Sequence, residues 1–317
     1  MDPITHYRDM VDRGIEEWIA SLPATSLYEP MVYLMRLPAK RIRPIATLMS
    51  CELFGGDPRS ALGPAIGIEL FHNFTLMHDD IMDQAPLRRG HSTVHERWNI
   101  NTAILSGDAM LVKAYQSIGS DPEVLRIFNS HALAVCEGQQ SDMDFEQRSD
   151  VSTAEYMEMI RRKTALLLAC AMRIGALIAG ADQRNSEAIG RFGEHLGIAF
   201  QLRDDLLDAF GDPAKLGKQQ GGDLRAGKKT LLLIKGLETE KQNGTSILSD
   251  QLSIDPDRRD VGSMLRELEL LGIRAMVEAE IEGHERSALQ ALAAIDVPGE
   301  RKRPLQQLAA SLMSRLH

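Results

Sequence analysis

Apolar residues recur with the period of an α-helix along almost the whole chain, and this pattern limits the fold most. They stand three and four positions apart, the spacing of one helix face. Val and Thr are scattered, and no alternating apolar segment bounded by turn residues indicates a strand. The chain is therefore predicted to be all-α. The predicted helices cover residues 4–22, 28–35, 43–54, 64–84, 92–98, 101–118, 122–147, 153–179, 184–210, 229–240, 261–271, 273–294 and 304–316.

The breaks between these helices are short and rich in Gly, Pro or polar residues. They cover residues 22–25, 55–58, 86–91, 211–227, 243–258 and 297–303. None is long enough to be a domain linker, and 317 residues suffice for one large core. We therefore expect residues 1–317 to form a single domain, a helical bundle in which facing helices build the ligand site.

Charge and hydropathy exclude several classes of protein. The net charge of −9 and the pI near 5.5 disfavour a nucleic-acid partner, because such binders carry a basic surface. The first residues lack the pattern of a secretory signal, and the longest apolar run, residues 164–181, contains Arg173 and fits a core helix better than a membrane span. Cys51, Cys136 and Cys170 fit no zinc pattern and are interpreted as buried hydrophobes in a reducing compartment. These features predict a cytoplasmic enzyme.

The pattern Asp-Asp-x-x-Asp occurs twice, 125 positions apart, each time in an apolar stretch. Burying aspartates is costly unless a positive group meets them. The first and last aspartates of each copy are four residues apart, so a helix places them on one face. Magnesium takes oxygen ligands, binding one or two carboxylates and the phosphates of a substrate. Two helices that converge on one magnesium-bound diphosphate are therefore predicted. The aspartates are Asp79, Asp80 and Asp83, then Asp204, Asp205 and Asp208.

Basic residues lie close to both copies in the sequence. Lys40 and Arg43 are at the start of a predicted helix, where free backbone N–H groups already favour anions. Arg88 and Arg89 follow the first copy, and a planar guanidinium grips phosphate with two bonds. The remaining basic candidates, near the second copy or at the start of an apolar helix, are Lys163, Lys218 and Lys228. Any one of them alone would more often be a solvated surface residue.

His78 directly precedes the first copy and suggests a second kind of site, the His-Asp metal site of phosphohydrolases. That site needs further histidines. His72 is six positions earlier and lies near the opposite helix face, so the two do not form one ligand pair. We predict that His78 is a core or supporting residue.

In combination and order, these motifs resemble the trans-isoprenyl diphosphate synthases. The resemblance covers residues 40–229 and rests on the stretches 40–44, 72–83, 88–90, 163–164 and 201–208 and on the Lys218 loop. It implies the all-α isoprenoid synthase bundle with a central active-site cavity. It also implies the head-to-tail condensation of isopentenyl diphosphate with an allylic diphosphate, and a homodimer.

The resemblance also assigns roles to the candidate residues. Asp79, Asp83 and Asp204 would be the main ligands of three magnesium ions, supported by Asp80, Asp205 and Asp208. Arg88, Lys163, Lys218 and Lys228 would hold the allylic diphosphate, and Lys40, Arg43, His72 and Arg89 would hold isopentenyl diphosphate. Thr164 and Gln201 would stabilise the allylic cation.

Product length is predicted from the helix that carries the first copy. Phe74 and Phe71 precede Asp79 by five and eight residues, close to one helix face. In the family that this chain resembles, an aromatic at the place of Phe74 limits elongation, and a second aromatic beside it gives a C15 product. Thr75 stands there instead. We expect C20 geranylgeranyl diphosphate, with C15 farnesyl diphosphate as the next choice, and Phe74 as ordinary core filler remains the alternative.

Two other functions compete with this one. A class I terpene cyclase would share the bundle and the first aspartate copy, but it would usually carry a different second metal motif and lack Lys40, Arg43 and His72. An inert regulatory subunit of a synthase would be expected to have lost aspartates, and both copies here are complete.

Overall fold

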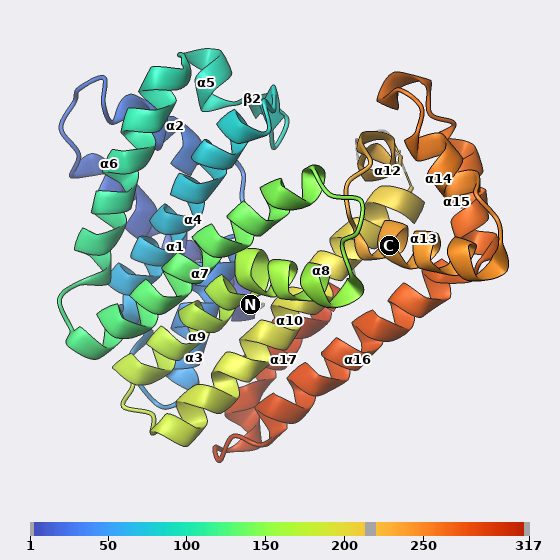
Figure 1. Ribbon diagram of the computed structural model, residues 1–317. Helices are drawn as coiled ribbons and strands as arrows, with labels where there is room; N and C mark the ends of the chain where they lie inside the picture. Colours follow the sequence, from blue (N-terminus) through green and yellow to red (C-terminus); the bar gives the residue numbers. More distant parts are fainter. Residues whose placement is uncertain (1–2, 213–219, 314–317) are drawn as a thin grey trace. The chain divides into compact units, whose positions relative to one another are not determined.

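The computed structural model describes residues 3–212 and 220–313 of the chain, and Figure 1 shows that they are almost entirely helical. Within these residues the only strands are β1 (Leu87–Arg88) and β2 (His91–Ser92). The prediction of an all-α fold is confirmed.

The chain divides into two compact units. Unit 1 comprises Met1–Asn129, Cys170–Ile189 and Asp296–Gln307, and unit 2 comprises Ser130–Ala169, Gly190–Ile295 and Leu308–His317. Among the described residues, four helices contribute to both units. They are α7 (Pro122–Glu146), α9 (Leu166–Ile178), α10 (Gln183–Phe210) and α17 (Gly299–Met313). The single domain remains a prediction.

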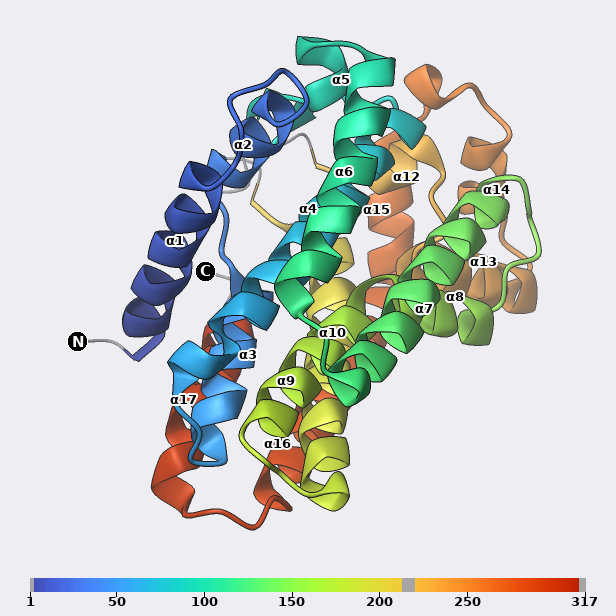
Figure 2. The same ribbon diagram turned by 90° about the vertical axis from the view of Figure 1, so that its left-hand side faces the viewer.

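Unit 1 is built around α4 (Leu62–Met82), the helix that ends at the first aspartate copy. Figures 1 and 2 show α4 beside α6, and it also contacts α1 and α3. Ile68, Leu70 and Phe71 of α4 are at most 1% exposed, so the helix is held in place along its length. The other elements that lie wholly in this unit are α1 (Pro3–Ala20), α2 (Glu29–Arg36), α3 (Ile42–Leu53), η1 (Pro58–Ala61), β1, β2, α5 (Val94–Arg97) and α6 (Ile100–Ile118).

Unit 2 has its own apolar core, in which Leu202 and Leu206 of α10 are buried with Leu233, Met264 and Ile273. Leu202 and Leu206 alternate along α10 with the aspartates of the second copy. Their burial therefore fixes where these aspartates lie along the helix axis and in which direction they point. The elements that lie wholly in this unit are α8 (Thr153–Ile160), η2 (Arg161–Ala165), α12 (Gly222–Ala226), α13 (Leu231–Asn243), α14 (Ile247–Leu252), η3 (Pro256–Arg258), α15 (Val261–Leu270) and α16 (Ile273–Ala293).

β1 and β2 form a hairpin with Leu87 opposite Ser92 and Arg88 opposite His91. The two residues between the strands, Arg89 and Gly90, both have positive φ, at 54° and 78°. Two successive positive φ angles are the mark of a type I′ turn, whose twist matches that of a hairpin. The predicted break at residues 86–91 is therefore an ordered turn.

Several predicted boundaries are wrong. Residues 153–179 are not one helix, because the π-helical turn η2 interrupts them; α12 lies in the predicted break 211–227; and α17 begins at Gly299, inside the predicted break 297–303. The predicted break 243–258 holds α14 and η3. The buried Glu240 carboxylate accepts the backbone N–H of Leu248 at 2.6 Å, and this cap from the preceding helix stabilises α14.

Two further expectations concern burial. Cys51 and Cys170 are buried, but Cys136 is exposed on α7, so its interpretation as a buried hydrophobe is wrong. Nowhere in residues 3–212 and 220–313 is there a helix with the length and apolar character that crossing a membrane requires.

Candidate active site

The first aspartate copy lies at the carboxyl end of α4. Asp83 is the C-cap and its backbone N–H donates to the Asp79 carbonyl at 2.8 Å. Asp80 is 1% exposed. The guanidinium of Arg88, on β1, donates to Asp80 Oδ1 from Nε at 2.7 Å and lies 2.6 Å from the same oxygen through Nη2. Burial raises the pKa of Asp80, and this ion pair opposes the shift.

A cationic cluster comes next in unit 1, where Arg43 Nη1 lies 3.2 Å from His72 Nε2. Burial, reinforced by the charges of Arg43, Arg89, Arg88 and Arg41, holds the pKa of His72 well below its usual value of 6.5. Because an arginine side chain only donates, His72 Nε2 is the acceptor in this bond, which requires a neutral ring. The cluster thus gathers guanidinium groups around an uncharged imidazole.

Two N–H groups of this cluster are buried without a protein partner among the residues that the structure describes, Arg43 Nε and Arg89 Nη1. Burial also lowers the pKa of both guanidiniums. A buried donor without an acceptor costs about 1–3 kcal/mol, more for a charged group, so the cluster favours an anion with oxygen acceptors. Lys40, in the loop before α3, is exposed.

Two arginines in and beside this cluster have unusual backbone conformations. Arg41 and Arg89 have φ of 52° and 54°, a left-handed region that non-glycine residues seldom occupy. Arg41 Nη1 is held by Glu69 Oε1 at 2.7 Å, with both side chains buried, and Glu69 Oε1 also accepts from Asn73 Nδ2 at 3.2 Å. Strained backbone that is fixed by a buried network is common at functional sites.

The second aspartate copy lies near the carboxyl end of α10 in a different environment. Gln201 Nε2 donates to Asp205 Oδ1 at 2.9 Å, and the Tyr156 hydroxyl donates to Asp205 Oδ2. Thr164 Oγ1 donates to Gln201 Oε1 at 3.0 Å, so the amide of Gln201 can adopt only one orientation. Burial raises the pKa of Asp205 to about 7, although both of its hydrogen bonds favour the carboxylate.

Asp208 joins the second copy to the segment after it. Its Oδ2 accepts the backbone N–H of Asp223 at 2.9 Å, at the start of α12. Lys228, an exposed residue just after α12, acts on Asp205 through its charge and favours the ionised carboxylate. Lys218 lies outside the described residues.

Lys163 and Thr164 lie in η2, whose π-helical turn is wider than an α-helical one. Lys163 Nζ donates to Asp142 Oδ2 of α7 at 2.5 Å. Two glycines make room for the bulge. A Cβ on Gly138 would lie 2.4 Å from the Lys163 nitrogen, and one on Gly197 would lie 2.6 Å from the Ala165 Cα. Such π-turns occur frequently at functional sites.

The residues predicted to set product length lie in unit 1. Phe71 is buried, and its ring centroid lies 5.6 Å from that of Phe74. The ring of Phe128 of α7 also packs edge-to-face with Phe71, with centroids 5.3 Å apart. Thr75 Oγ1 donates to the His72 carbonyl at 2.8 Å, so its hydroxyl is satisfied within its own helix.

Whether these residues suit magnesium can be judged from the donors. Each copy supplies carboxylate oxygens, the ligands that magnesium prefers. Among the residues the structure describes, no three His, Cys, Asp or Glu side chains gather closely enough to hold a metal ion by themselves. Magnesium usually takes only one or two carboxylates and fills its other positions with water and substrate phosphates. The aspartates therefore fit magnesium that binds together with a diphosphate.

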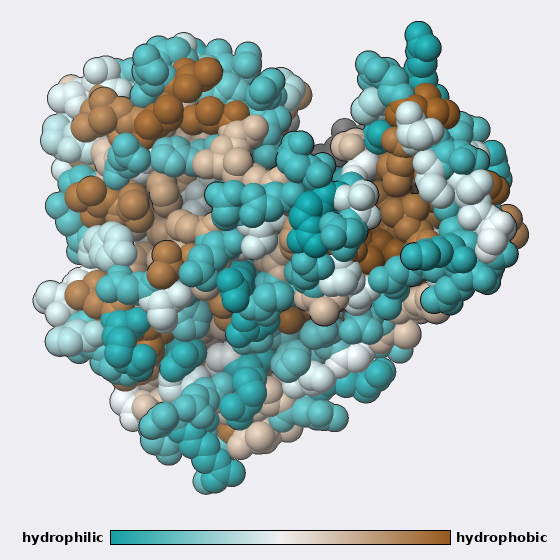
Figure 3. Space-filling model, viewed as in Figure 1, coloured by the Kyte–Doolittle hydropathy of each residue, from teal (hydrophilic) through white to brown (hydrophobic). Residues whose placement is uncertain are grey.

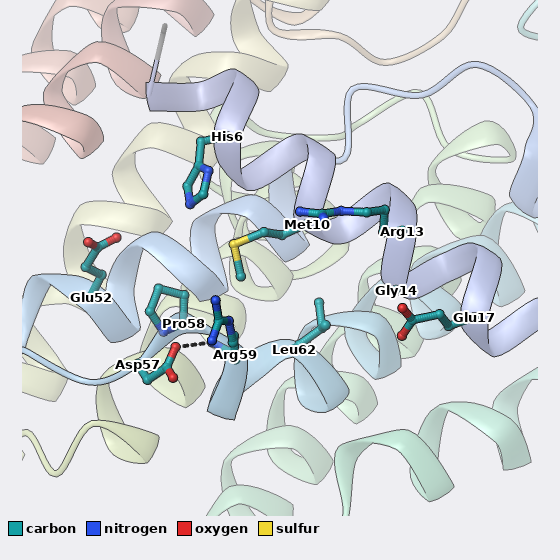
Figure 4. A pocket seen from close by; sticks show the side chains of 10 residues that line it. All are labelled: His6, Met10, Arg13, Gly14, Glu17, Glu52, Asp57, Pro58, Arg59 and Leu62. Atoms are coloured by element: carbon teal, nitrogen blue, oxygen red, sulfur yellow. Dashed lines mark hydrogen bonds between the residues drawn. The ribbon is translucent and has the colours of Figure 1, made fainter.

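A cavity of unit 1, shown in Figure 4, lies away from these residues and has a volume of about 490 Å³. None of the predicted site residues lines it, and none of its lining side chains is among the described buried polar groups that lack a partner. Acidic and basic side chains both line it, so it offers no single charge to a ligand. It is lined by His6, Met10, Arg13, Gly14, Glu17, Glu52, Asp57, Pro58, Arg59 and Leu62.

Four residues of these networks were not predicted from the sequence: Glu69, Asp142, Tyr156 and Asp223. Glu69 had a usable signal, because it is the one charged residue in the apolar stretch 62–77. The others had none, because their partners are distant in sequence. The prediction that the two aspartate copies converge joins residues of different units and remains a prediction.

Comparisons with known proteins were made on the whole chain. Residues 24–268 match the model of the polyprenyl synthetase family. A short chain isoprenyl diphosphate synthase of Methanothermobacter thermautotrophicus is 36% identical, over 100% of this chain and 99% of its own length. A geranylgeranyl diphosphate synthase of Sulfolobus acidocaldarius is 43% identical over 70% of each chain.

Solved structures agree with these sequence relatives. A crystal structure of a geranylgeranyl pyrophosphate synthase superposes with a TM-score of 0.93 and 39% identity, and each chain is covered completely. Because the family model spans most of the sequence and relatives above 30% identity cover its whole length, the chain belongs to the polyprenyl synthetase family.

Proposed function

We propose that this protein is a magnesium-dependent prenyltransferase that condenses isopentenyl diphosphate with an allylic diphosphate of 5 to 15 carbons, and that its main product is C20 geranylgeranyl diphosphate. Family membership supports the reaction class. The names of several relatives, which are geranylgeranyl diphosphate synthases, support the product. We place the enzyme in the cytoplasm, as its sequence predicts.

The observation that carries the proposal is the cationic cluster of unit 1. Arg43 and Arg89 each leave a buried N–H without a partner in the described part of the chain, next to a neutral His72. A diphosphate supplies several oxygen acceptors in one group. We assign this cluster, with Lys40, to isopentenyl diphosphate, whose diphosphate is not the leaving group and needs only to be held.

We assign the aspartates of both copies to magnesium, which would neutralise the departing diphosphate of the allylic substrate. Six carboxylates suffice for three magnesium ions, because each ion usually binds one or two carboxylates. Arg88, Lys163 and Lys228 would hold the same diphosphate, together with Lys218. Arg88 and Lys163 already pair with Asp80 and Asp142, so these carboxylates keep both cations in place before substrate binds.

Thr164 and Gln201 would stabilise the allylic cation through oxygen atoms. The Thr164 hydroxyl donates to Gln201 Oε1, which leaves the lone pairs of its own oxygen available to a positive centre. Gln201 is in turn fixed by Asp205. Fixed dipoles of this kind need no reorganisation when charge develops.

Incubating the purified protein with magnesium, isopentenyl diphosphate and farnesyl diphosphate, and sizing the dephosphorylated products by mass spectrometry, tests the proposal. A C20 alcohol is expected. Elongation of geranyl but not farnesyl diphosphate would make the protein a C15 synthase. A cyclic hydrocarbon formed without isopentenyl diphosphate would favour a terpene cyclase. Absence of turnover with every allylic substrate would favour an inert subunit.

We also propose a homodimer that forms through α6. This helix exposes a stripe of apolar side chains, and Figure 3 shows brown atoms gathered over it. Leu105 and Val112 are 61% and 57% exposed and lie two turns apart on one face. A contiguous apolar patch of this kind commonly marks a protein interface. Light scattering should give a dimer mass for the wild type and a monomer mass for the Leu105→Glu, Val112→Glu double variant.

A further inference from the structure

Phe74, the predicted limit on product length, is held from the side opposite Phe71 by His78. The two residues are four apart on α4, so they lie on one helix face. Their ring centroids are 4.8 Å apart with planes at 67°, an edge-to-face contact. Phe71 lies 5.6 Å away on the other side. Phe74 is therefore confined between two rings of its own helix.

His78 is itself fixed by α6. Its Nε2 lies 3.2 Å from the backbone carbonyl oxygen of Ile104. Because a carbonyl oxygen only accepts, His78 must carry its proton on Nε2 and donate to Ile104. The bond sets the rotation of the imidazole, and so the face that it offers to Phe74.

Gly107 makes this arrangement possible. A Cβ on Gly107 would lie 2.2 Å from His78 Nε2 and 2.6 Å from its Cδ2, both shorter than any real contact. The imidazole thus occupies the volume that any other residue at 107 would fill. A larger side chain there must displace His78 from Ile104 and from Phe74.

We propose that His78 and Gly107 are positioning residues for product length, acting through Phe74. The proposal rests on the function proposed above and adds to it residues that contact neither diphosphate. Losing the edge-to-face contact frees Phe74 to move aside, and the prenyl chain can then grow past C20.

The test compares three variants, Gly107→Ala, His78→Ala and the double variant, in the elongation of farnesyl diphosphate. Each single variant should raise the ratio of C25 to C20 product about fivefold, the effect expected from losing one aromatic pair. The double variant should show no further rise, because both changes break the same contact. Gly107→Ala should keep the kcat for the first condensation while it changes the product.

Gly283→Ala is the matched control, because a Cβ on that helical glycine meets nothing within 4 Å. It should leave the product at C20. A folded, active Gly107→Ala enzyme that stops at C20 would overturn the proposal, and so would strictly additive effects in the double variant. If Gly107→Ala does not fold, His78→Ala decides alone, and an unchanged product overturns the proposal.

A readout that needs no turnover separates this proposal from the function it rests on. The ¹⁵N chemical shifts of His78 should show the Nε2–H tautomer in the wild type and a loss of that preference in Gly107→Ala. A wild type that never elongates farnesyl diphosphate refutes the proposed C20 product. A wild-type His78 protonated on Nδ1 alone refutes the contact with Ile104.

Discussion

The two aspartate copies have the same sequence pattern but different surroundings. The central residue of each is buried: Asp80 at 1% exposure and Asp205 at 8%. Asp80 faces a guanidinium, Arg88, which belongs to the hairpin just after its helix. Asp205 faces two neutral donors, Tyr156 of α8 and Gln201, which lies one turn earlier on α10. The same motif is thus stabilised by charge in one unit and by neutral hydrogen bonds in the other.

This difference indicates that the aspartates within each copy have different roles. The central aspartate orients neighbouring side chains, Arg88 in one case and Gln201 in the other. The first aspartates, Asp79 and Asp204, are only partly buried and suit direct contact with a metal–diphosphate complex. The outer and central positions can therefore be separated by mutation.

The largest effect is expected at the outer positions. Asp79→Ala and Asp204→Ala should each lower kcat by at least about 100- to 1,000-fold, because each removes a carboxylate proposed to hold the magnesium that neutralises the departing diphosphate. Circular dichroism should show an unchanged helical fold. Asp9→Ala, at an exposed position of α1, should retain wild-type turnover. Wild-type rates in Asp79→Ala or Asp204→Ala would contradict the metal assignment.

The central positions should differ in stability. Asp80→Asn leaves the Arg88 guanidinium without its carboxylate and should lower the free energy of unfolding by about 3 kcal/mol. Asp205→Asn keeps hydrogen-bonding capacity beside neutral donors and should cost about 1 kcal/mol. Urea denaturation measures both. Equal losses would contradict the contrast drawn between the two copies.

Product length should change with substitutions near Phe74 in unit 1 and not with substitutions in the core of unit 2. Phe74→Ala should shift the product beyond C20, by about tenfold in the ratio of C25 to C20, because it removes the ring altogether. Phe145→Ala removes a ring of the same size from the core of unit 2 and should leave the product at C20. Mass spectrometry of the alcohols separates these outcomes, and an unchanged product in Phe74→Ala would exclude its role.

The smallest effect concerns a histidine pair of unit 2. His195 Nδ1 and His284 Nδ1 are 3.0 Å apart, and burial followed by the charge of His195 lowers the pKa of His284, against Glu280 and Glu194. Below pH 6.5 the unfolded chain binds more protons at His284 than the folded one does. The free energy of unfolding should therefore decrease as the pH is lowered below 6.5, by less than about 1.4 kcal/mol per pH unit.

His284→Gln should flatten this pH dependence in urea denaturation at pH 5 to 7. His91→Gln, at an exposed residue of β2, is the matched control and should keep the wild-type slope. Parallel slopes for the wild type and His284→Gln would show that the pair does not contribute.

The sequence predicted what depends on local spacing. It identified the all-α fold, the family and the prenyltransferase class, because periodicity and paired aspartates are visible along the chain, and the structure and the comparisons confirm these. It could not find Tyr156 or Asp142, whose partners Asp205 and Lys163 are 49 and 21 positions away. It also missed η2, because a π-turn depends on the room that Gly138 and Gly197 leave and not on its own residues.

That π-turn makes the length of the chain near Lys163 as important as its composition. A π-turn holds one more residue than an α-helical turn of the same rise. Deleting one residue from 161–165 would restore a regular helix and leave the turns on either side in register, because the wide turn absorbs one extra residue. Lys163 and Thr164 would then lose the displaced backbone from which they reach Asp142 and Gln201. In relatives of this chain, a single-residue gap at this place in an alignment should accompany a change of chemistry, even where every motif residue is retained.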